Sequence, residues 1–138
     1  MLAALARIAP DQITAPFWEA CRGRELRFRR CAGCGRFRHP PLAGCPNCGS
    51  SAATWERVAG RGTVFSFTIA HHAAVATLAG DTPYVVLVVE FADAPGVRLI
   101  SNLLGGPHAD LRVGAPVDLL WDEVSADVIL PRFQLVRP

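Results

Sequence analysis

The chain has 138 residues, of which 51% are hydrophobic and 19% charged, so it can fold around a core and is not expected to be disordered. No apolar stretch reaches the length of a membrane span, and the first ten residues lack the basic start and long apolar run of a secretory signal. We therefore expect a cytoplasmic protein with reduced cysteines and no membrane partner.

Charge is unevenly distributed along the chain, although the formal net charge is only +2. Every strong cation is an arginine, because lysine is absent. Residues 22–61 contain nine arginines and two glutamates, whereas residues 62–138 contain four arginines and eight acidic residues. Arginine suits bidentate contact with phosphate or carboxylate, so the first of these regions is predicted to present a surface to anions.

Two short helices are predicted before residue 24. The first is weakly amphipathic, covers residues 2–8 and stops at Pro10. The second begins after Thr14 as the N-cap, has Pro16 in its first turn and ends at residue 21 or 22.

The second helix is too short to be stable alone, so its aromatic residues are expected to dock on the rest of the chain or on another chain. Phe17 and Cys21 share one face, with Trp18 beside them. Cys21 has no partner in a Cys-x-x-Cys pair and is interpreted as a small apolar residue of the helix.

Four cysteines form two Cys-x-x-Cys pairs that are separated by ten residues. They are Cys31, Cys34, Cys45 and Cys48. Four thiolates at tetrahedral corners are typical of structural zinc, and this spacing lets all four reach one ion. Rubredoxin-like iron has the same geometry, while two disulfides are disfavoured in a reducing compartment. A zinc ribbon is therefore predicted over residues 24–54.

A strand over residues 25–30 leads into the first cysteine pair, with Leu26 and Phe28 facing inward. The candidate anion contacts of the ribbon are Arg27, Arg29, Arg36 and Arg38. His39 follows them and is predicted to lie outside the metal ligand set, because four thiolates already complete that set.

From Gly62 onward the periodicity indicates β-strands and no long helix. Five strands are predicted, over residues 63–70, 84–91, 97–104, 116–123 and 128–136. Their number and spacing favour a partly open barrel of OB type over residues 55–138, and a five-stranded sandwich is the alternative. The fold class is thus mainly β, with a helical segment over residues 1–23 in front of the ribbon.

Two of these strands have informative side-chain patterns. In the first, Phe65 and Phe67 are expected to share a face with Ile69. The second is apolar on both faces, so its outer side is expected to be covered by the docked helix or by a partner protein. The outer residues are Tyr84, Val86 and Val88.

We find no set of nucleophile, base and oxyanion donor at plausible positions, so the chain is predicted not to be an enzyme by itself. His71 and His72 are adjacent at the end of a strand and point to opposite faces there, so a solvent or interface position is the simpler interpretation.

Taken in order, the motifs resemble the small zinc-ribbon plus OB-fold proteins that accompany thiolase-like enzymes. The resemblance covers residues 14–136 and is specific in its ordered combination. Besides both cysteine pairs, it is carried by Phe17-Trp18-Glu19, Glu25-Leu26-Arg27, His39-Pro40-Pro41, Gly60-Arg61-Gly62, Pro83-Tyr84 and Pro131-Arg132-Phe133.

The resemblance implies a non-catalytic accessory subunit of a thiolase, of hydroxymethylglutaryl-CoA synthase or of a thiolase-like aldolase of steroid side-chain degradation. Residues Arg27, Arg29, Arg36 and Arg38 would then contact acyl-CoA phosphates, with the acyl-CoA at a site shared with the partner. Candidate contacts with the catalytic subunit are Phe17, Trp18, Tyr84, Val86 and Val88. A nucleic-acid-binding ribbon and OB-fold protein is the alternative, which the acidic barrel region disfavours.

Overall fold

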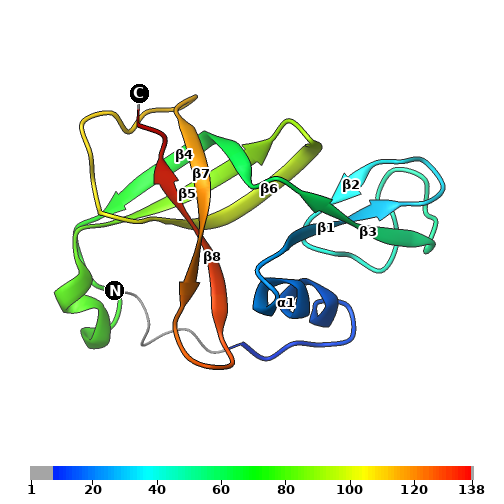
Figure 1. Ribbon diagram of the computed structural model, residues 1–138, viewed down its shortest axis with the longest axis horizontal. Coiled ribbons are helices and arrows are strands. Elements are labelled where there is room, and N and C mark those ends of the chain that lie inside the picture. The colour runs from blue at the N-terminus through cyan, green and yellow to red at the C-terminus, as the bar shows by residue number, and fades with distance from the viewer. Residues whose placement is uncertain (1–7, 138) are drawn as a thin grey trace.

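A small ribbon sheet and a five-stranded barrel lie end to end in the computed structural model, which describes residues 8–137, and a helix packs at their junction (Figure 1). The helix is α1 (Ala15–Arg22). The ribbon strands are β1 (Leu26–Cys31), β2 (Phe37–Arg38) and β3 (Ala53–Val58). The barrel strands are β4 (Arg61–Ala70), β5 (Tyr84–Phe91), β6 (Ala94–Leu103), β7 (Pro116–Glu123) and β8 (Ile129–Leu135), with a short 3₁₀ helix, η2 (Ala76–Asp81), before β5.

The five barrel strands close in the order β4-β5-β6-β8-β7. All neighbours are antiparallel except β6 and β8, which are parallel where Leu103 meets Phe133. The predicted mainly β class, with a four-cysteine ribbon and a five-stranded barrel, is therefore confirmed, and the sandwich alternative is wrong. Most of the helix predicted over residues 2–8 lies outside the described residues.

The helix α1 packs against the rest of the same chain. This is one of the two predicted alternatives, the other being packing against another chain. Phe17 is only 4% exposed and Cys21 is fully buried. Burial raises the pKa of the Cys21 thiol to about 12, which makes it an inert core residue. No helix in the described part of the chain is long and apolar enough to cross a membrane.

The helix α1 starts at the predicted N-cap residue, but the predicted side-chain capping hydrogen bond is not formed. Thr14 is the N-cap residue and Pro16 is in the first turn, but the Thr14 side chain makes no capping bond to the helix. Instead the Asp11 carboxylate accepts hydrogen bonds from the N–H groups of Ile13 at 2.9 Å and Thr14 at 2.7 Å. The Thr14 hydroxyl donates to the same carboxylate, so Asp11 organises the turn that precedes the helix.

A β-bulge changes the face on which Phe65 lies. The register of β4 against β5 shifts between Val64 and Ser66, so Phe65 is the extra residue. Val64 takes the core position and Phe65 is exposed beside Arg98, whose guanidinium carbon is 4.0 Å from the ring centre. The prediction that Phe65 shares a face with Phe67 is therefore wrong.

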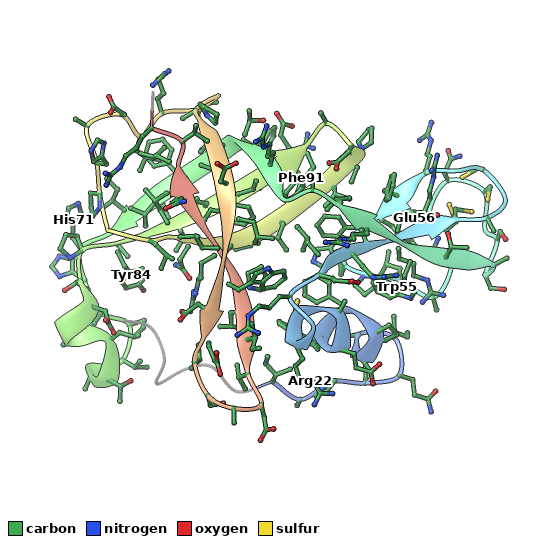
Figure 2. The ribbon with its side chains drawn as sticks, viewed as in Figure 1. Arg22, Trp55, Glu56, His71, Tyr84 and Phe91 are labelled. Atoms are coloured by element: carbon green, nitrogen blue, oxygen red, sulfur yellow. The ribbon has the colours of Figure 1, made fainter. Side chains whose placement is uncertain are left out.

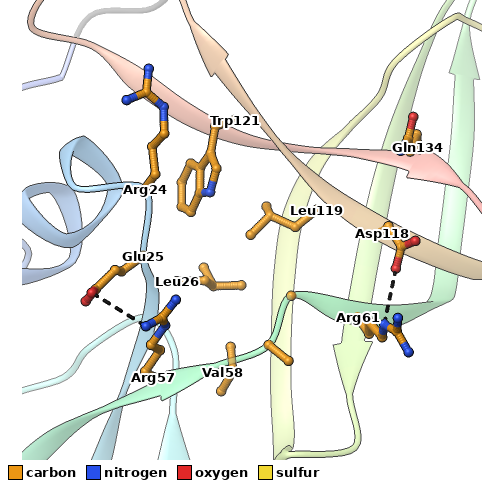
Figure 3. Close-up of a pocket in the computed structure, with 12 residues that line it drawn as sticks. Arg24, Glu25, Leu26, Arg57, Val58, Arg61, Asp118, Leu119, Trp121 and Gln134 are labelled. Atoms are coloured by element: carbon orange, nitrogen blue, oxygen red, sulfur yellow. Dashed lines mark ion pairs between the residues drawn. The ribbon is translucent and has the colours of Figure 1, made fainter.

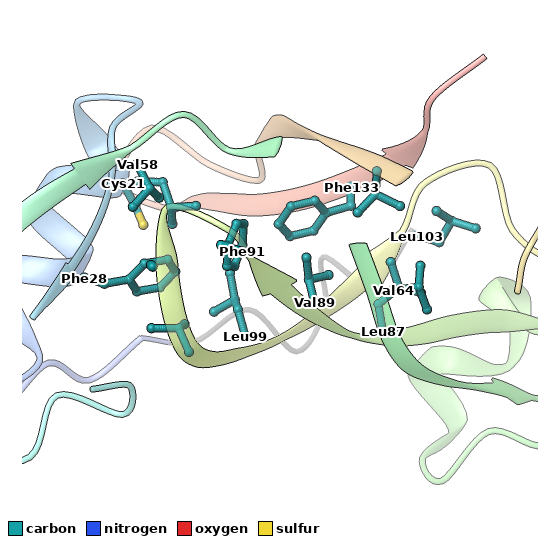
Figure 4. Close-up of a cluster of buried hydrophobic side chains, with 14 of the residues drawn as sticks. Cys21, Phe28, Val58, Val64, Leu87, Val89, Phe91, Leu99, Leu103 and Phe133 are labelled. Carbon is teal, nitrogen blue, oxygen red and sulfur yellow. The ribbon is translucent and has the colours of Figure 1, made fainter. Parts of the chain in front are cut away.

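One apolar core runs through all three parts of the molecule (Figure 4). Phe28 of β1 lies between Phe17 of α1, at a ring-centre distance of 6.5 Å, and Phe91 of β5, at 5.3 Å. Phe91 in turn lies 6.1 Å from Phe133 of β8. The ribbon and the barrel therefore share one hydrophobic core, and they are not two separate domains joined by a linker.

The connection from ribbon to barrel is fixed by hydrogen bonds to the barrel. The Ala59 N–H donates to the Asp93 carboxylate at 3.0 Å, and the Gly60 carbonyl accepts from the Leu119 N–H at 3.0 Å. Gly60 has a φ of +80°, and a Cβ on it would lie 2.7 Å from the Cβ of Leu119. Only glycine fits this position without strain.

Replacing Gly60 by alanine is expected to lower the unfolding free energy by about 3 kcal/mol, because it adds left-handed strain and overlap with Leu119. The matched control is Gly96→Ala, whose φ is +86° but whose added Cβ would meet nothing within 4 Å. That variant should lose only about 1 kcal/mol. Urea unfolding followed by tryptophan fluorescence measures both, and equal losses would show that the contact with Leu119 is unimportant.

Candidate functional site

The four cysteines converge at the tip of the ribbon in a geometry that suits one metal ion. Their sulfur atoms all lie within 4.8 Å of one another. The Sγ atoms of Cys31 and Cys48, and those of Cys34 and Cys45, are 3.6 Å apart. A tetrahedral ion with metal–sulfur bonds of about 2.3 Å would separate its sulfurs by about 3.8 Å. All four cysteines are free, so the disulfide alternative is wrong for this structure.

Each cysteine pair lies on a tight turn that ends in a left-handed glycine. The Gly35 N–H donates to the Cys31 carbonyl at 2.9 Å, and the Gly49 N–H donates to the Cys45 carbonyl at 2.8 Å. Both glycines have a φ close to +78° (77° and 78°). The backbone N–H of Cys34, 3.4 Å from the Cys31 sulfur, is the main group that lowers the pKa of the Cys31 thiol.

The predicted anion contacts do not form one cluster. Arg36 is exposed near the first cysteine pair, while Arg27 is held by the Glu25 carboxylate at 2.7 Å. Arg38 is only 5% exposed, and its guanidinium donates to the Leu42 carbonyl at 2.7 Å. Arg38 therefore supports the ribbon loop and has no surface left for a ligand, so the structure removes it from the anion contacts.

Arg29 lies directly opposite Arg38 in the ribbon sheet and is half-buried. Its Nε and the Nη1 of Arg38 are buried without a hydrogen-bond partner among the described residues. Alternation alone could not reveal the burial of Arg38, because the pattern assigns a residue to a face of the sheet but does not show that the following loop, at Leu42 and Ala43, folds back over its guanidinium group.

A second group of arginines, which the sequence did not single out, surrounds a hinge pocket of about 440 Å³ between ribbon and barrel (Figure 3). They are Arg24, Arg57 and Arg61. Arg57 lies 3.8 Å from the Glu25 carboxylate and Arg61 lies 3.9 Å from that of Asp118. Such long, exposed ion pairs contribute little and leave the guanidinium groups of Arg57 and Arg61 accessible, whereas Arg24 is paired with the Glu123 carboxylate at 2.9 Å. No sequence signal brings these residues together, because β3 and the β3–β4 connection meet the start of β1 only in the fold.

A larger hollow, here called the ribbon–barrel groove, has a volume of about 550 Å³ and separates α1 and the ribbon loop from strands β5, β6 and β8. Its apolar walls come from Trp18, Pro40, Pro41, Val86, Ile100 and Leu130. Ile100 is 71% exposed, which is unusual for so large an apolar side chain beside a groove.

Buried polar side chains line one part of this groove. Arg132 is 6% exposed, and its Nε donates to the Asp122 carboxylate at 3.2 Å. Its Nη1 donates to the side-chain oxygen of Asn102, whose amide in turn donates to the Val85 carbonyl at 3.0 Å. The Ser101 hydroxyl, also buried, donates to a backbone carbonyl of β8 at 2.6 Å. The network fixes the position of Arg132 in the groove.

His39 lies outside the metal cluster, at the other end of the ribbon loop. Its ring centre is 5.0 Å from that of Phe17 and 5.3 Å from that of Phe28. Burial lowers the pKa of His39 to about 4, so the imidazole is neutral at pH 7. Its Nδ1 has no hydrogen-bond partner among the described residues.

The five residues that were predicted to contact a partner lie in three different environments. Phe17 is inside the core and cannot touch a partner, whereas Trp18 and Val86 line the groove. Tyr84 and Val88 are half-buried on the outer face of β5, and Val88 pairs with the exposed Ile100 of β6.

The two adjacent histidines lie far from the metal cluster. His71 follows the end of β4 beside Tyr84, at the end of the barrel remote from Trp55 and Glu56 of the ribbon (Figure 2). Both His71 and His72 are exposed.

Comparison with known proteins matches both parts of the chain. The model of the ChsH2 rubredoxin-like zinc ribbon domain matches residues 18–53, and that of the ChsH2 C-terminal OB-fold domain matches residues 55–122. The chain is also similar to a structure of the Ltp2-ChsH2(DUF35) aldolase, with a TM-score of 0.82 and 37% identity over 94% of this chain and 98% of that chain. A DUF35 protein from Sulfolobus solfataricus shares the fold at 17% identity, with a TM-score of 0.66 over 91% of this chain and 86% of that one.

Two curated relatives are longer than this chain. A probable enoyl-CoA hydratase alpha subunit of Thermomonospora curvata is 41% identical over 123 residues, which are 88% of this chain and 37% of the relative. The 3-oxo-4,17-pregnadiene-20-carboxyl-CoA hydratase alpha subunit of Mycobacterium tuberculosis is 37% identical over 115 residues, which are 83% of this chain and 35% of the relative. The chain thus spans little more than a third of either relative.

The geometry of the cysteines predicts one metal ion per chain. Replacing the ligand Cys34 by serine is expected to reduce the metal content well below one ion and to lower the melting temperature, because the ribbon loses a thiolate. Replacing the buried non-ligand Cys21 by alanine is the matched control and should keep the metal. Elemental analysis with thermal unfolding measures both, and full metal content in the Cys34→Ser protein would contradict the assignment.

Proposed function

Because the chain belongs to the ChsH2 family of rubredoxin-like zinc ribbons joined to OB-fold domains, we propose that it is an accessory subunit of a thiolase-like acyl-CoA enzyme. The observation that carries the proposal is its similarity, over nearly the whole of both chains, to a chain of the Ltp2-ChsH2(DUF35) aldolase. The hydratase alpha subunits named above support acyl-CoA thioesters as the substrate class.

The metal is proposed to be zinc and to be structural. Four thiolates fill a tetrahedral shell and leave no position for water or substrate. The ion would hold the two cysteine turns together and so fix the ribbon against the barrel. A site of reduced thiolates also fits the cytoplasm, which is the location we propose.

The catalytic groups are proposed to reside in the partner. Among the described residues, no histidine shares a hydrogen bond with a serine, threonine or cysteine that could act as a nucleophile. His108 contacts only the neighbouring Asp110, in an exposed loop. These observations support a role in binding and positioning.

The outer face of the barrel is the proposed docking surface for the catalytic subunit. Val88 and Ile100 pair across β5 and β6, and the exposed Phe65 lies on the same side beside Arg98. This docking face, defined by Phe65, Val88 and Ile100, offers apolar area that α1 leaves uncovered, because α1 packs on β1 and β8. Tyr84 extends it along β5.

Arginines of the ribbon are proposed to contact the phosphates of the acyl-CoA. Arg36 is exposed, and Arg27 and Arg29 lie on one face of β1. Guanidinium groups bind phosphate oxygens with charge-assisted hydrogen bonds, which supports this assignment. The arginines of the hinge pocket are the competing set.

Disruption of the docking face should abolish assembly. In co-expression with a candidate thiolase-like catalytic subunit, the Ile100→Asp variant is expected to bind at least tenfold more weakly, because it buries a charge in an apolar interface. The matched control is Val113→Asp, since Val113 is also an exposed apolar residue, at 65%, but lies on the loop before β7. Size-exclusion chromatography measures the complex.

Two results would contradict the docking proposal. Equal loss of assembly in the Ile100→Asp and Val113→Asp proteins would mean that the barrel face is not the interface. Tight, salt-sensitive binding of single-stranded DNA by the lone chain would support the nucleic-acid alternative instead.

The phosphate contacts are tested by paired substitutions in the assembled complex. The Arg27→Ala, Arg36→Ala double variant is expected to weaken acyl-CoA binding about tenfold, because two charge-assisted contacts are lost. The Arg57→Ala, Arg61→Ala double variant removes the same charge from the hinge pocket and should leave the affinity unchanged. Isothermal titration measures both, and the reverse result would place the phosphates in the hinge pocket.

A further inference from the structure

We propose that the two exposed cysteines of the metal cluster, Cys34 and Cys48, are sites of oxidation by hydrogen peroxide, and that each then forms a disulfide with the buried cysteine of the other turn. The ribbon thereby exchanges one metal ion for two cross-links. The proposal goes beyond the accessory role, because it assigns a covalent modification to the lone chain and needs no partner. It rests on the metal site proposed above.

Exposure divides the four cysteines into two kinds. Cys31 and Cys45, the first cysteines of the two pairs, are only 2% and 5% exposed. Cys34 and Cys48, the second cysteines, are both exposed. A thiolate is oxidised where an oxidant can reach it, so peroxide reaches one sulfur on each turn before the other.

The distances pair each exposed sulfur with a buried sulfur of the other turn. The Sγ atom of Cys48 lies 3.6 Å from that of Cys31, and the Sγ atom of Cys34 lies 3.6 Å from that of Cys45. A disulfide requires a separation of about 2.05 Å, so a small closing movement suffices for each pair. All four sulfurs lie within 4.8 Å of one another, which makes a disulfide inside each Cys-x-x-Cys pair the competing outcome.

The chemistry balances with one molecule of peroxide for each pair. The exposed thiolate attacks a peroxide oxygen, so an S–O bond forms, the O–O bond breaks and hydroxide leaves. The buried thiolate then attacks the sulfur of this sulfenic acid, so the S–S bond forms, the S–O bond breaks and a second hydroxide leaves. The two sulfurs lose two electrons, and the peroxide is reduced to two hydroxide ions.

Cross-turn disulfides preserve the shape of the ribbon. They join the same two turns that the metal ion joins, but a disulfide sulfur is no longer a thiolate ligand, so the metal leaves. Because the ribbon stays closed, Phe28 keeps its contacts with Phe17 and Phe91. Oxidation therefore releases the metal without unfolding the chain, and reduction restores the site.

Tryptic mapping of the oxidised, full-length chain tests the pattern of disulfides. The arginines place Cys31 and Cys34 in a peptide of residues 31–36, and Cys45 and Cys48 in a peptide of residues 39–57. After peroxide treatment of the metal-loaded chain and alkylation of the remaining thiols, the two peptides are expected to be joined in one species. Its fragmentation should pair Cys31 with Cys48 and Cys34 with Cys45. Two separate peptides with internal disulfides, or four alkylated thiols, would overturn the proposal.

Metal release and folding are measured on the same samples. A chromogenic chelator is expected to report at least a tenfold fall in bound metal, while the circular dichroism and tryptophan fluorescence spectra stay unchanged. A phosphine reductant with added zinc should restore one ion per chain. The Cys21→Ala variant, which lacks only the buried cysteine outside the cluster, is the matched control and should behave in the same way. Unfolding on oxidation would contradict the cross-turn pattern.

Dimedone, which traps sulfenic acids, identifies the sulfurs that react first. Adducts are expected on Cys34 and Cys48 in at least tenfold excess over Cys31 and Cys45, and equal labelling would mean that exposure does not select the site. Failure of the metal assignment is distinguishable from failure of this proposal. A reduced chain that binds no metal would contradict the former, while the disulfide map would still decide the latter.

Discussion

The contact between Phe28 of the ribbon and Phe91 of the barrel, with ring centres 5.3 Å apart, is the constraint on which the rest of the structure depends. Without its metal, a ribbon of this size has too little core to fold by itself. Because Phe28 also packs against Phe17 and His39, the four thiolates indirectly hold α1 in place. The ion at the tip of the molecule thereby shapes the groove, which is lined by the same helix and loop.

Local patterns predicted most of the fold. The Cys-x-x-Cys spacing singled out the four cysteines whose sulfur atoms converge, and alternation located five barrel strands, because both signals depend on residues close together in sequence. The bulge at Phe65 was not predicted. One extra residue moves the side chains before it to the opposite face of the strand relative to those after it, and the composition of the strand does not show this. The burial of Arg38 also escaped, because the carbonyl of Leu42 that binds it lies in a loop without periodicity.

The candidate sites outside the metal centre could not be predicted in the same way. The groove joins Trp18, Pro41 and Leu130, which are separated by most of the chain. The charge of Arg132 in this groove is balanced by an ion pair with Asp122 across two paired strands. The number of charged residues can be counted in the sequence. Only the register of β7 and β8 shows that the positive charge of Arg132 is balanced by the negative charge of Asp122.

Closure of the barrel has a consequence for how any partner can be recognised. The strands β4 to β8 close into a ring, but β6 and β8 pair only where Leu103 meets Phe133, so the remaining length of β6 has one hydrogen-bonded neighbour, β5. A partner can therefore contact β6 through its side chains and, along this edge, through its backbone. Ile100 lies on this stretch of β6 and is 71% exposed, so an exposed apolar side chain and a strand edge occur at the same place.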